Sequence, residues 1–536
     1  MTCDTRKSRD FLSAISGLKE DFTPIKTQIK KGAYFDSVSL MQISRKLNSI
    51  KGVADSAVIM ATRENKNIIK ASGLLTAEIE KAGDNDLAIA VKAKNDALCG
   101  EALKEAESLL TRKEAPSSET RAKADSVDSA VKNFPGLNMA LISVNGRYAG
   151  KLAFDCLEKG MNVMVFSDNV PLETELELKK LAVKKGLLLM GPDCGTAVIN
   201  GAPLGFANAV NRGRIGVVGP SGTGMQEVTS VISNAGAGIS QAIGTGARDV
   251  KKDVGGLTTI AALKMLAEDP GTDVIVIVSK PPHEEVLKKI LGEVKKIKKP
   301  VVSVFIGAEF KSEIKNLHTA GSLYAAGLKA VSLSKGENIH RVKEEIYNEK
   351  LKMTVPVKRE RAGKEKRQRY IRGLFSGGTF AAEAQFVLKE IIGAVNSNIP
   401  FDKKYKLKNS MELKENSVID LGEDEFTFGR PHPMIDFSLR NKMIAAQSKD
   451  REVSVILLDL VLGYGSNENP LEDIGPHLKA AFRNNPRLTV VTSITGTDAD
   501  PQNKRKVAEG LKALGVHVFP SNYLAALMAG EIVRAK

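Results

Sequence analysis

The chain of 536 residues carries 78 Lys and Arg against 63 Asp and Glu, which gives a formal net charge of +15. Its 42% hydrophobic content is enough for conventional folded domains, and the length suggests about three of them. The basic residues are spread along the chain and only 5% of residues are aromatic, so the charge does not indicate a nucleic-acid-binding protein.

The cysteine spacing and the apolar runs indicate which metal, membrane and export features the sequence lacks. The four cysteines, Cys3, Cys99, Cys156 and Cys194, are not spaced as metal ligands or as a redox pair. The apolar run VILLDLVLGYG is too short to cross a membrane and contains Asp459. The first residues, MTCDTRKSRD, are polar and have no apolar core for export. We therefore expect a cytoplasmic protein without a metal site or a membrane span.

Residues 1–125 are predicted to form a small α/β N-terminal domain. Short apolar runs there alternate with amphipathic segments, which indicates strands and helices packed together. The expected strands are residues 33–36, 57–60 and 86–91, and the expected helices begin at Ser37 and at about Asn95. The polar tract EAPSSET at 114–120 indicates a linker.

From Asn138 onward strands and helices alternate regularly, which predicts doubly wound parallel sheets. We expect one Rossmann-like α/β domain over 126–211 and a flavodoxin-like domain over 212–345. The segment 346–369 contains the charged run KRERAGKEKR and is predicted to be a basic linker. A third α/β domain is expected over 370–536.

Three glycine-rich turns between residues 187 and 250 each follow a short apolar run. Such turns present backbone N–H groups at the carboxyl ends of parallel strands, where helix N-termini favour anions. The sequence therefore predicts a phosphate or substrate site made by Asp193, Cys194, Gly195, Pro220, Ser221, Gly222, Thr223, Gly224, Gly244, Thr245 and Gly246. Alternatively, the middle turn only caps its helix. No Lys follows Gly224, so it is not a Walker A loop and no nucleotide is implied.

Several charged residues near these turns are further candidates. Lys280 at a strand end would attract a phosphate or a carboxylate, and Arg248 suits a carboxylate unless it pairs with a neighbouring Asp. His432, held between two prolines, could act as an acid, a base, a subunit contact or a structural residue. These three are the predicted catalytic residues. Glu227 could orient a donor or answer the helix dipole, and Cys194 could be a nucleophile but packs by default.

A set of motifs spread over almost the whole chain identifies a family resemblance. The motifs are MGPDCGT at 190–196, PLGFAN at 203–208, IGVVGPSGTG at 215–224, HPMID at 432–436, LLDLVLGYG at 457–465 and DPQ at 500–502. Together they resemble the FdrA family of the succinyl-CoA synthetase α-subunit superfamily. The resemblance implies a CoA-binding-type Rossmann domain, a flavodoxin-like ligase domain and a C-terminal ligase-CoA-like domain, in that order.

The resemblance also implies a function. FdrA-type proteins are similar to a subunit of oxamate carbamoyltransferase, which converts oxalurate and phosphate to oxamate and carbamoyl phosphate in anaerobic allantoin and purine catabolism. This reading implies companion subunits, an oligomer and a small anionic substrate held at 221–224 and Lys280. Alternatively, the chain is a subunit of an NDP-forming acyl-CoA synthetase, with an ATP-grasp partner supplying CoA or nucleotide chemistry and His318 as the nearest phosphohistidine candidate. A non-catalytic scaffold subunit is the third alternative.

Overall fold

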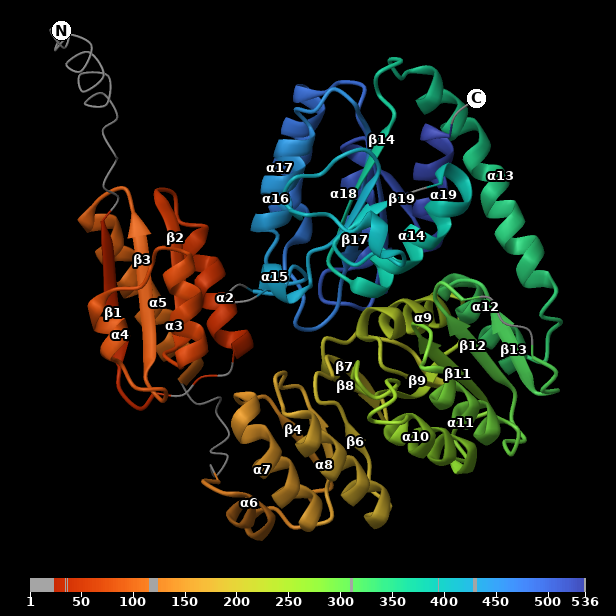
Figure 1. Ribbon diagram of the computed structural model, residues 1–536, viewed down its shortest axis with the longest axis horizontal. Helices are drawn as coiled ribbons and strands as arrows, with labels where there is room; N and C mark the ends of the chain where they lie inside the picture. The colour runs from red at the N-terminus through yellow and green to blue at the C-terminus, as the bar shows by residue number, and fades with distance from the viewer. Residues whose placement is uncertain are drawn as a thin grey trace, which may run out of the picture. The chain divides into compact units, whose positions relative to one another are not determined.

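A computed structural model of the chain describes residues 24–33, 35, 37–114, 124–308, 312–393, 395–427 and 431–534. The chain forms two compact units, Met1–Thr120 and Arg121–Lys536, each with its own core. Figure 1 shows the first unit in red to orange and the second in gold to blue. Within the described residues, no helix is both long enough and apolar enough to cross a bilayer.

The first unit is a small antiparallel sheet with helices on both faces. Its elements are β1 (Ile25–Lys30), α2 (Ser37–Asn48), β2 (Val53–Met60), α3 (Arg63–Ala71), α4 (Ala77–Lys81), β3 (Leu87–Ala93) and α5 (Asp96–Glu114), and the strand order is β1-β3-β2. Side chains of β3 alternate between two cores, because Leu87 and Ile89 pack toward α2 and α5 while Ala88 and Ala90 pack toward α3 and α4. The predicted small α/β unit is confirmed.

One predicted strand of this unit is wrong. In the predicted segment 33–36, Ala33 and Phe35 are loop residues, and Tyr34 and Asp36 lie outside the described residues. The third strand is instead β1, which pairs with β3 along its whole length. Its sequence, IKTQIK, has too few apolar residues to mark a strand without knowledge of its partner.

The second unit begins with a three-stranded parallel sheet of order β4-β5-β6. Its elements are α6 (Val127–Asn133), β4 (Met139–Ile142), α7 (Gly146–Glu158), β5 (Asn162–Val165), α8 (Leu172–Lys185) and β6 (Leu189–Met190). A Cβ at Gly146 would collide with the backbone of Asp168 and Asn169, so this glycine lets the start of α7 approach the loop after β5.

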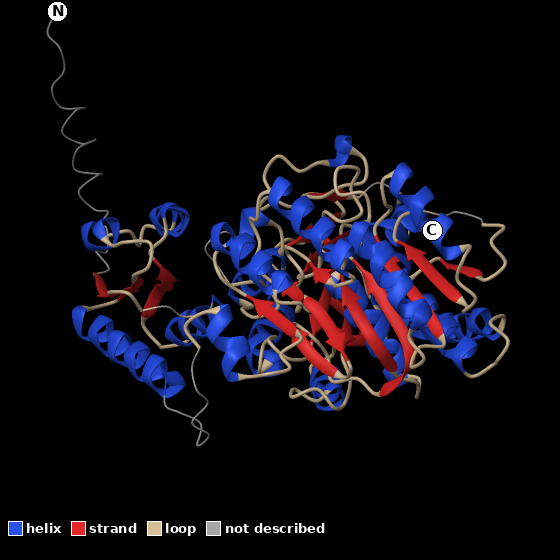
Figure 2. Ribbon diagram, turned by 90° about the horizontal axis from the view of Figure 1, so that it is seen from below, coloured by secondary structure: helices blue, strands red, loops and turns tan. Residues whose placement is uncertain are grey.

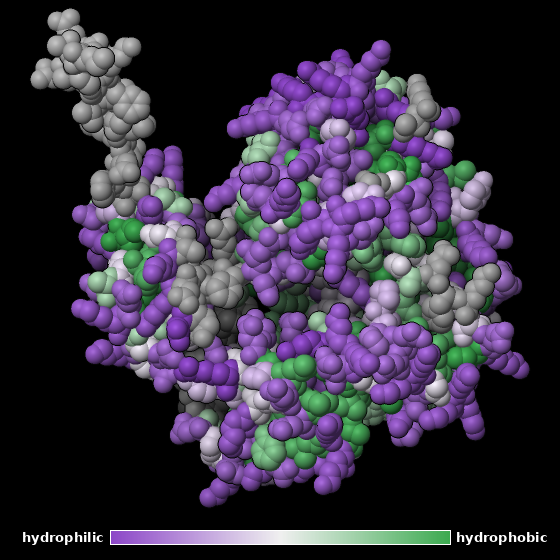
Figure 3. All heavy atoms as spheres, in the orientation of Figure 1, coloured by the Kyte–Doolittle hydropathy of each residue, from purple (hydrophilic) through white to green (hydrophobic). Residues whose placement is uncertain are grey.

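This small sheet carries much of the exposed apolar surface of the molecule. Seven large apolar side chains between residues 134 and 183 are more than a third exposed: Phe134, Leu137, Leu141, Tyr148, Phe154, Leu172 and Val183. Figure 3 shows green side chains gathered over the same part of the molecule. Apolar patches on a folded protein often mark contact surfaces.

A seven-stranded sheet of order β13-β12-β11-β9-β10-β7-β8 follows. Its elements are β7 (Thr196–Ile199), β8 (Ala202–Gly205), β9 (Arg212–Gly219), α9 (Gly222–Asn234), β10 (Ile239–Gly244), α10 (Leu257–Glu268), β11 (Val274–Ser279), α11 (Glu284–Val294), β12 (Val301–Phe305), β13 (Leu317–Ala320) and α12 (Leu323–Ser334). The strands from β13 to β10 are parallel, whereas the β7–β8 hairpin is antiparallel. Helices α10 and α11 cover one face, and α9 packs with α12.

A long helix, α13 (Arg341–Ala362), leads to a six-stranded parallel sheet of order β15-β16-β14-β17-β18-β19. Its elements are β14 (Tyr370–Phe375), α14 (Gly378–Ile392), β15 (Asn396–Ser397), the 3-10 helix η1 (Lys403–Tyr405), β16 (Ser417–Asp420), α15 (Asp424–Thr427), α16 (Ser438–Gln447), β17 (Val453–Val461), α17 (Pro470–Asn484), β18 (Thr489–Thr495), α18 (Lys504–Ala513), β19 (His517–Phe519) and α19 (Asn522–Val533). Much of the segment predicted as a basic linker is therefore helical. Figure 2 shows the strands in red with helices around them.

The two large sheets repeat one plan. The order β13-β12-β11-β9-β10 in the first corresponds to β19-β18-β17-β14-β16 in the second. Helices α9 and α14 each follow the central strand of this set, and each begins with Gly-Thr followed by a Glu in its second turn, Glu227 and Glu383. Helices α12 and α19 both start from a Ser cap, Ser322 and Ser521.

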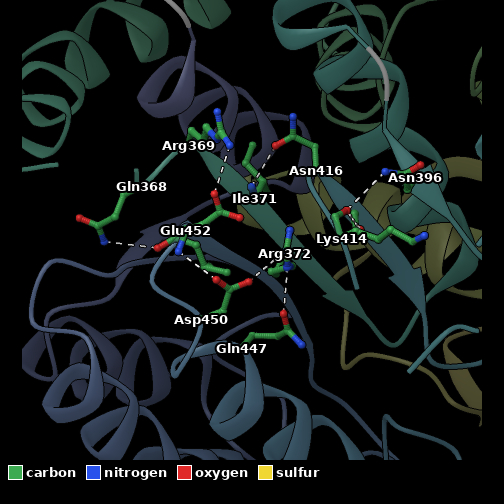
Figure 4. A network of polar contacts seen from close by, with 12 residues as sticks. Gln368, Arg369, Ile371, Arg372, Asn396, Lys414, Asn416, Gln447, Asp450 and Glu452 are labelled. Atoms are coloured by element: carbon green, nitrogen blue, oxygen red, sulfur yellow. Dashed lines mark hydrogen bonds and ion pairs between the residues drawn. The ribbon is translucent and has the colours of Figure 1, made fainter. Parts of the chain in front are cut away.

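A polar network fixes the amino end of β14, opposite the turn that leads into α14. The guanidinium of Arg372, only 2% exposed, donates to Gln447 at 2.9 Å and pairs with Asp450 at 3.0 Å. The N–H of Ile371 donates to the side-chain oxygen of Asn416 at 3.0 Å. Figure 4 shows these side chains converging from neighbouring strands and loops. The network holds the central strand of the sheet in register.

A buried ion cluster ties α8 of the small sheet to the turn after β10. Lys179 Nζ lies 2.7 Å from Asp249 and 3.3 Å from Glu175, and all three side chains are fully buried. Lys179 also donates to the carbonyl of Thr245 at 2.9 Å. Asp249 accepts from the N–H groups that open α10, at Thr258 and Thr259. The cluster therefore fixes the glycine-rich turn at 244–246.

Replacing Lys179 by Ala leaves the buried Asp249 without a cation, while Glu175 keeps its ion pair with Arg248. Losing one partner of a buried ion pair costs about 3–5 kcal/mol, so we expect the free energy of unfolding, measured by denaturant titration, to fall by that amount. Lys180→Ala, at an exposed position on the same helix, is the control and should change it by no more than about 0.5 kcal/mol. Equal effects of the two substitutions would contradict a stabilising cluster.

Candidate functional site

The middle glycine-rich turn forms the N-terminus of α9 as predicted. Ser221 caps the helix, since its Oγ accepts from the N–H of Gly224 at 3.0 Å. No described group accepts from the N–H groups of Ser221, Gly222 or Thr223, which lie at the half-buried start of the helix. These donors and the helix dipole give this end a positive potential that favours an anion.

The N-terminus of α14 lies directly against this turn. Ser221 Oγ and Thr379 Oγ1 are 2.5 Å apart. A Cβ at Gly377 would come within 2.7 Å of the Thr223 side chain, so only glycine permits this approach. In Figure 1, α9 and α14 lie along the boundary between the two large sheets. Two positive helix ends thus meet at one place, which we call the seam.

Part of the α14 end is already neutralised by the protein itself. The carboxylate of Asp459 accepts from the N–H groups of Ser376 and Gly377 at 2.9–3.1 Å and from the Ser376 hydroxyl at 2.9 Å. Arg440 pairs with it at 3.1 Å. Burial raises the pKa of Asp459, and the opposing effects of Arg440 and Ser376 favour its charged form. The end of α9 is therefore the more available one for an external anion.

Lys280, a predicted catalytic residue, reaches the seam from the turn after β11. Its Nζ lies 3.5 Å from the position of a Cβ on Gly378, the first residue of α14. The Asp420 carboxylate, at the end of β16, lies even closer to the same point. The lysine is exposed and has no ion-pair partner among the described residues. It is available to an anion.

Asp420 also lies near His432, because a Cβ at Gly422 would stand 3.1 Å from Asp420 Oδ1 and 3.0 Å from His432 Nε2. Asp420 is 3% exposed, its Oδ1 accepts from the N–H of Gly422 at 2.8 Å, and burial raises its pKa to about 7. His432 Nδ1 accepts from the N–H of Met434 at 3.2 Å, which leaves the proton of the neutral ring on Nε2. Burial lowers the pKa of His432 to about 4. Lys280 and His432 are thus brought together around an Asp that the sequence analysis did not single out.

Arg248, the third predicted catalytic residue, lies elsewhere. Its Nε pairs with the buried Glu175 at 2.7 Å, and it donates to the carbonyl of Val170 at 2.7 Å. Gly244, Thr245 and Gly246 belong to the same turn, which the buried ion cluster holds. Arg248 thus forms an ion pair, although with Glu175 rather than with the Asp that the sequence suggested.

The turn after β6 holds one exposed acid and one packed thiol. Asp193 adopts a left-handed backbone conformation with a φ of 56°. Although its side chain is exposed, the surrounding chain desolvates the carboxyl and raises its pKa to about 6, with Asp168 and Asp424 contributing. Cys194 is buried, and burial raises its pKa to about 12. Its thiol packs against Gly244, where a Cβ would collide with the sulfur, and Gly195 follows in the same turn. A thiolate nucleophile does not fit this environment.

Glu227 and Glu383 bind the two sheets together instead of facing a ligand. Glu227 accepts from the Thr495 hydroxyl and from the N–H of Asn522 at 3.0 Å. Glu383 accepts from the N–H of Leu323 and from the Asn522 amide, both at 2.9 Å. Each Glu therefore caps the first turn of a helix that belongs to the other sheet. Burial raises the pKa of both, that of Glu383 to about 7.

His318 lies on β13, the edge strand of its sheet, beside Val302. Three strand spacings separate β13 from β9, which amounts to roughly 14 Å. Its pKa is lowered by burial and by Lys329. The structure therefore does not bring His318 to the turn at 221–224.

Four of the motifs that carry the family resemblance meet between the two large sheets. The Asn208 amide donates to the carbonyl of Leu462 at 2.8 Å and to Asp500 at 2.9 Å. Ala207 forms an isolated bridge with Tyr464, and the Phe206 ring lies 6.1 Å from that of His432, centroid to centroid. The segments at 203–208, 432–436, 457–465 and 500–502 therefore hold the two large sheets together.

Sequence reasoning missed Asp420, Asp459, Arg440, Gly377 and Thr379. A signal was present for part of this set, because the Gly-Thr of α9, with a Glu in the next turn, recurs at the start of α14. Recognising that repeat would have indicated a second helix N-terminus of the same kind. The buried Asp459 and Arg440 carry no comparable local signal.

Three family models match parts of the chain. A model described as "CoA binding domain" matches residues 210–307, the segment that the sequence analysis expected to be flavodoxin-like. One described as "CoA-ligase" matches 374–532. One described as "AllF, heavy metal-associated domain" matches 23–127.

The described part of the first unit does not fit a metal ion. Its Cys99 is buried and contacts the carbonyls of Pro24 and Val91 at 3.3 and 3.5 Å. No group of three or more His, Cys, Asp or Glu side chains suited to a metal is found in the described residues.

The curated relatives agree with the fold. The chain is 42% identical to "Uncharacterized protein YahF" of Escherichia coli (strain K12), over 95% of this chain and 98% of that protein. It is 26% identical to "ADP-forming sulfoacetate-CoA ligase subunit SauD" of Bilophila wadsworthia over 38% of this chain and 70% of that one. With the succinate–CoA ligase α subunit of Methanothermobacter thermautotrophicus it shares 25% identity over 37% and 66%.

A solved structure is also similar. The dinucleotide-forming acetyl-coenzyme A synthetase 1 of Ca. Korarchaeum cryptofilum aligns with 78% of this chain and 87% of its own at 15% identity and a TM-score of 0.33, too low a score to support a conclusion.

The two large sheets and the domain matches define an acyl-CoA-ligase-like protein related to succinyl-CoA synthetase α subunits. Within that class, the chain belongs to the YahF family.

The burial of Cys194 gives a direct test of the thiol's role. Iodoacetamide reacts with thiolates, so the folded protein at pH 8 should leave Cys194 unmodified in peptide mass spectrometry, because its pKa of about 12 keeps the thiol protonated. The same protein in guanidinium should be modified fully. Rapid labelling of Cys194 in the folded state would restore it as a candidate nucleophile.

Proposed function

We propose that this chain is a subunit of an NDP-forming acyl-CoA ligase and that it holds the phosphoryl end of an acyl phosphate at the seam. The observation that carries the proposal is the group of unpartnered N–H donors at Ser221–Thr223, faced by Lys280 and by a second helix N-terminus. Fixed donors of this kind stabilise charge that develops on phosphate oxygens during acyl transfer. Ligase subunits among the relatives support the reaction class.

Companion chains are part of the proposal. The family matches cover a CoA-binding and a CoA-ligase domain, so a nucleotide-activating partner of the ATP-grasp type would supply the phosphoryl group. CoA would then accept the acyl group from the acyl phosphate and release phosphate. The small acid that is activated, the oligomeric state and a cytoplasmic location also belong to this proposal.

A second candidate is carbamoyl transfer, as in oxamate carbamoyltransferase. The observation that favours it is the position of His318, three strands away from the turn at 221–224. Transfer between oxamate and carbamoyl phosphate forms oxalurate and releases phosphate without a phosphohistidine. The anion site at the seam would serve this reaction equally well.

The two candidates differ in their substrates. With its companion chains, the protein should form a CoA thioester from acyl phosphate and CoA, or release phosphate from carbamoyl phosphate and oxamate. Phosphate release that requires oxamate and not CoA would select carbamoyl transfer. If the assembled complex reacts with one of these pairs and keeps that activity when Ser221 and Lys280 are replaced, the chain is a non-catalytic scaffold. If neither pair reacts with any companion set, both candidate functions are wrong.

Lys280→Ala tests the site itself. A hydrogen bond from a charged donor contributes about 1.5–3 kcal/mol, so the apparent affinity for the phosphorylated substrate should fall roughly 10- to 100-fold. Lys288→Ala, on the exposed face of α11, should leave the affinity unchanged. Equal kinetics for both variants and the unaltered protein would exclude Lys280 from substrate binding.

A further inference from the structure

Asp420 occupies an unusual place for a carboxyl group, because it faces an anion site from inside the protein. It ends β16 and is 3% exposed. Its Oδ1 accepts from the N–H of Gly422, whereas its Oδ2 has no hydrogen-bond partner among the described residues and is directed at the first residue of α14. The backbone of Asp420 is paired with the Asn398 side-chain amide through both its C=O and its N–H, at 2.8 and 3.0 Å, which fixes the point from which the carboxyl group extends.

Two glycines make room for this arrangement. A Cβ at Gly378 would collide with Asp420 Oδ2 and would stand 3.5 Å from Lys280 Nζ. A Cβ at Gly422 would stand 3.0 Å from His432 Nε2 and 3.1 Å from Asp420 Oδ1. The carboxyl group therefore lies near a lysine that follows a strand of one sheet and a histidine that belongs to its own sheet.

The neighbouring charges influence whether Asp420 is protonated or ionised, and only the protonated form can donate a hydrogen bond to an anion. Lys280 favours the carboxylate, whereas Glu423 and Asp459 oppose it, and Arg440 neutralises Asp459. His432 is neutral, since burial lowers its pKa to about 4. An ionised Asp420 would repel an anion held at the seam, while a protonated Asp420 has an O–H to donate to it.

We propose that anion binding at the seam is coupled to the uptake of one proton by Asp420, whose protonated carboxyl then donates a hydrogen bond to the bound phosphate or carboxylate. This inference rests on the proposed function because it uses the same anion site. It adds to the proposed function that Asp420 holds one proton while the anion is bound. When the anion leaves, Asp420 releases this proton to the solvent and becomes a carboxylate again.

The geometry favours Asp420 over its neighbours for this role. His432 accepts from Met434 through Nδ1 and has a pKa of about 4, so it does not change charge near neutral pH. Asp459 is held by two backbone N–H groups and by Arg440, which leaves it no free oxygen for a ligand. Burial raises the pKa of Asp420 to about 7, which lies in the range where substrate binding can change its protonation.

Sulfate is the probe for this coupling, because its own charge does not change between about pH 5.5 and 8.5 and so cannot mimic the protein's titration. Calorimetric titration of the full chain should show affinity for sulfate that falls up to tenfold for each pH unit above about 7. Repeating the titration at pH 7.5 in buffers of different ionisation enthalpy should show that part of one proton is taken up from the buffer.

Asp420→Asn should bind sulfate with an affinity that no longer depends on pH, and without proton uptake, because the amide donates a hydrogen bond but does not titrate. Glu423→Gln is the matched control and should keep the pH dependence. If Asp420→Asn does not fold, the buffer experiment on the unaltered protein still shows whether sulfate binding takes up a proton.

Some results would contradict only the role of Asp420, whereas others would contradict the anion site as well. Sulfate binding that is independent of pH and takes up no proton, or pH dependence that persists in Asp420→Asn, overturns the role of Asp420 and leaves the anion site intact. Absence of sulfate binding at pH 6, or binding unaffected by Lys280→Ala, overturns the site and both proposals together.

Discussion

The close contact between the N-termini of α9 and α14 is the constraint on which the rest of the site depends. It is possible because Gly377 has no side chain where Thr223 lies, and because Gly378 has none where Asp420 and Lys280 approach. Two helix ends of the same sign would repel each other, so their contact needs compensating charge. The carboxylate of Asp459 supplies this negative charge for α14, whereas the N–H groups at the start of α9 have no acceptor among the described residues.

Two buried carboxylates farther from the seam, Glu227 and Glu383, also compensate the positive ends of helices. Glu227 and Glu383 each accept from the first turn of a helix in the opposite sheet and share Asn522. Each thus neutralises a buried helix end and fixes one sheet against the other. Because the two sheets repeat one plan, the arrangement occurs twice with similar residues. A seam held in this way can present rigid donors to a reactant.

The sequence predicted the parts of the site that depend on neighbouring residues. The strand, turn and helix at 215–227 are local, and a buried apolar run before Pro-Ser-Gly-Thr-Gly has few other conformations. Asp420, Asp459 and Arg440 were missed because they reach α14 through strand pairing and burial that sequence spacing does not encode. Glu227 was expected either to orient a donor at the site or to interact with the dipole of its own helix, because both roles follow from its position near the helix start. It instead accepts hydrogen bonds from residues almost 300 positions away.

The central claim is that the seam holds an anion on backbone donors of α9. A crystal structure of the protein soaked with tungstate, a phosphate-like anion that scatters anomalously, tests it most directly. We expect an anomalous peak within hydrogen-bond distance of the N–H groups of Ser221–Thr223 and near Lys280. A seam filled by the protein's own side chains, with tungstate bound only elsewhere, would contradict it.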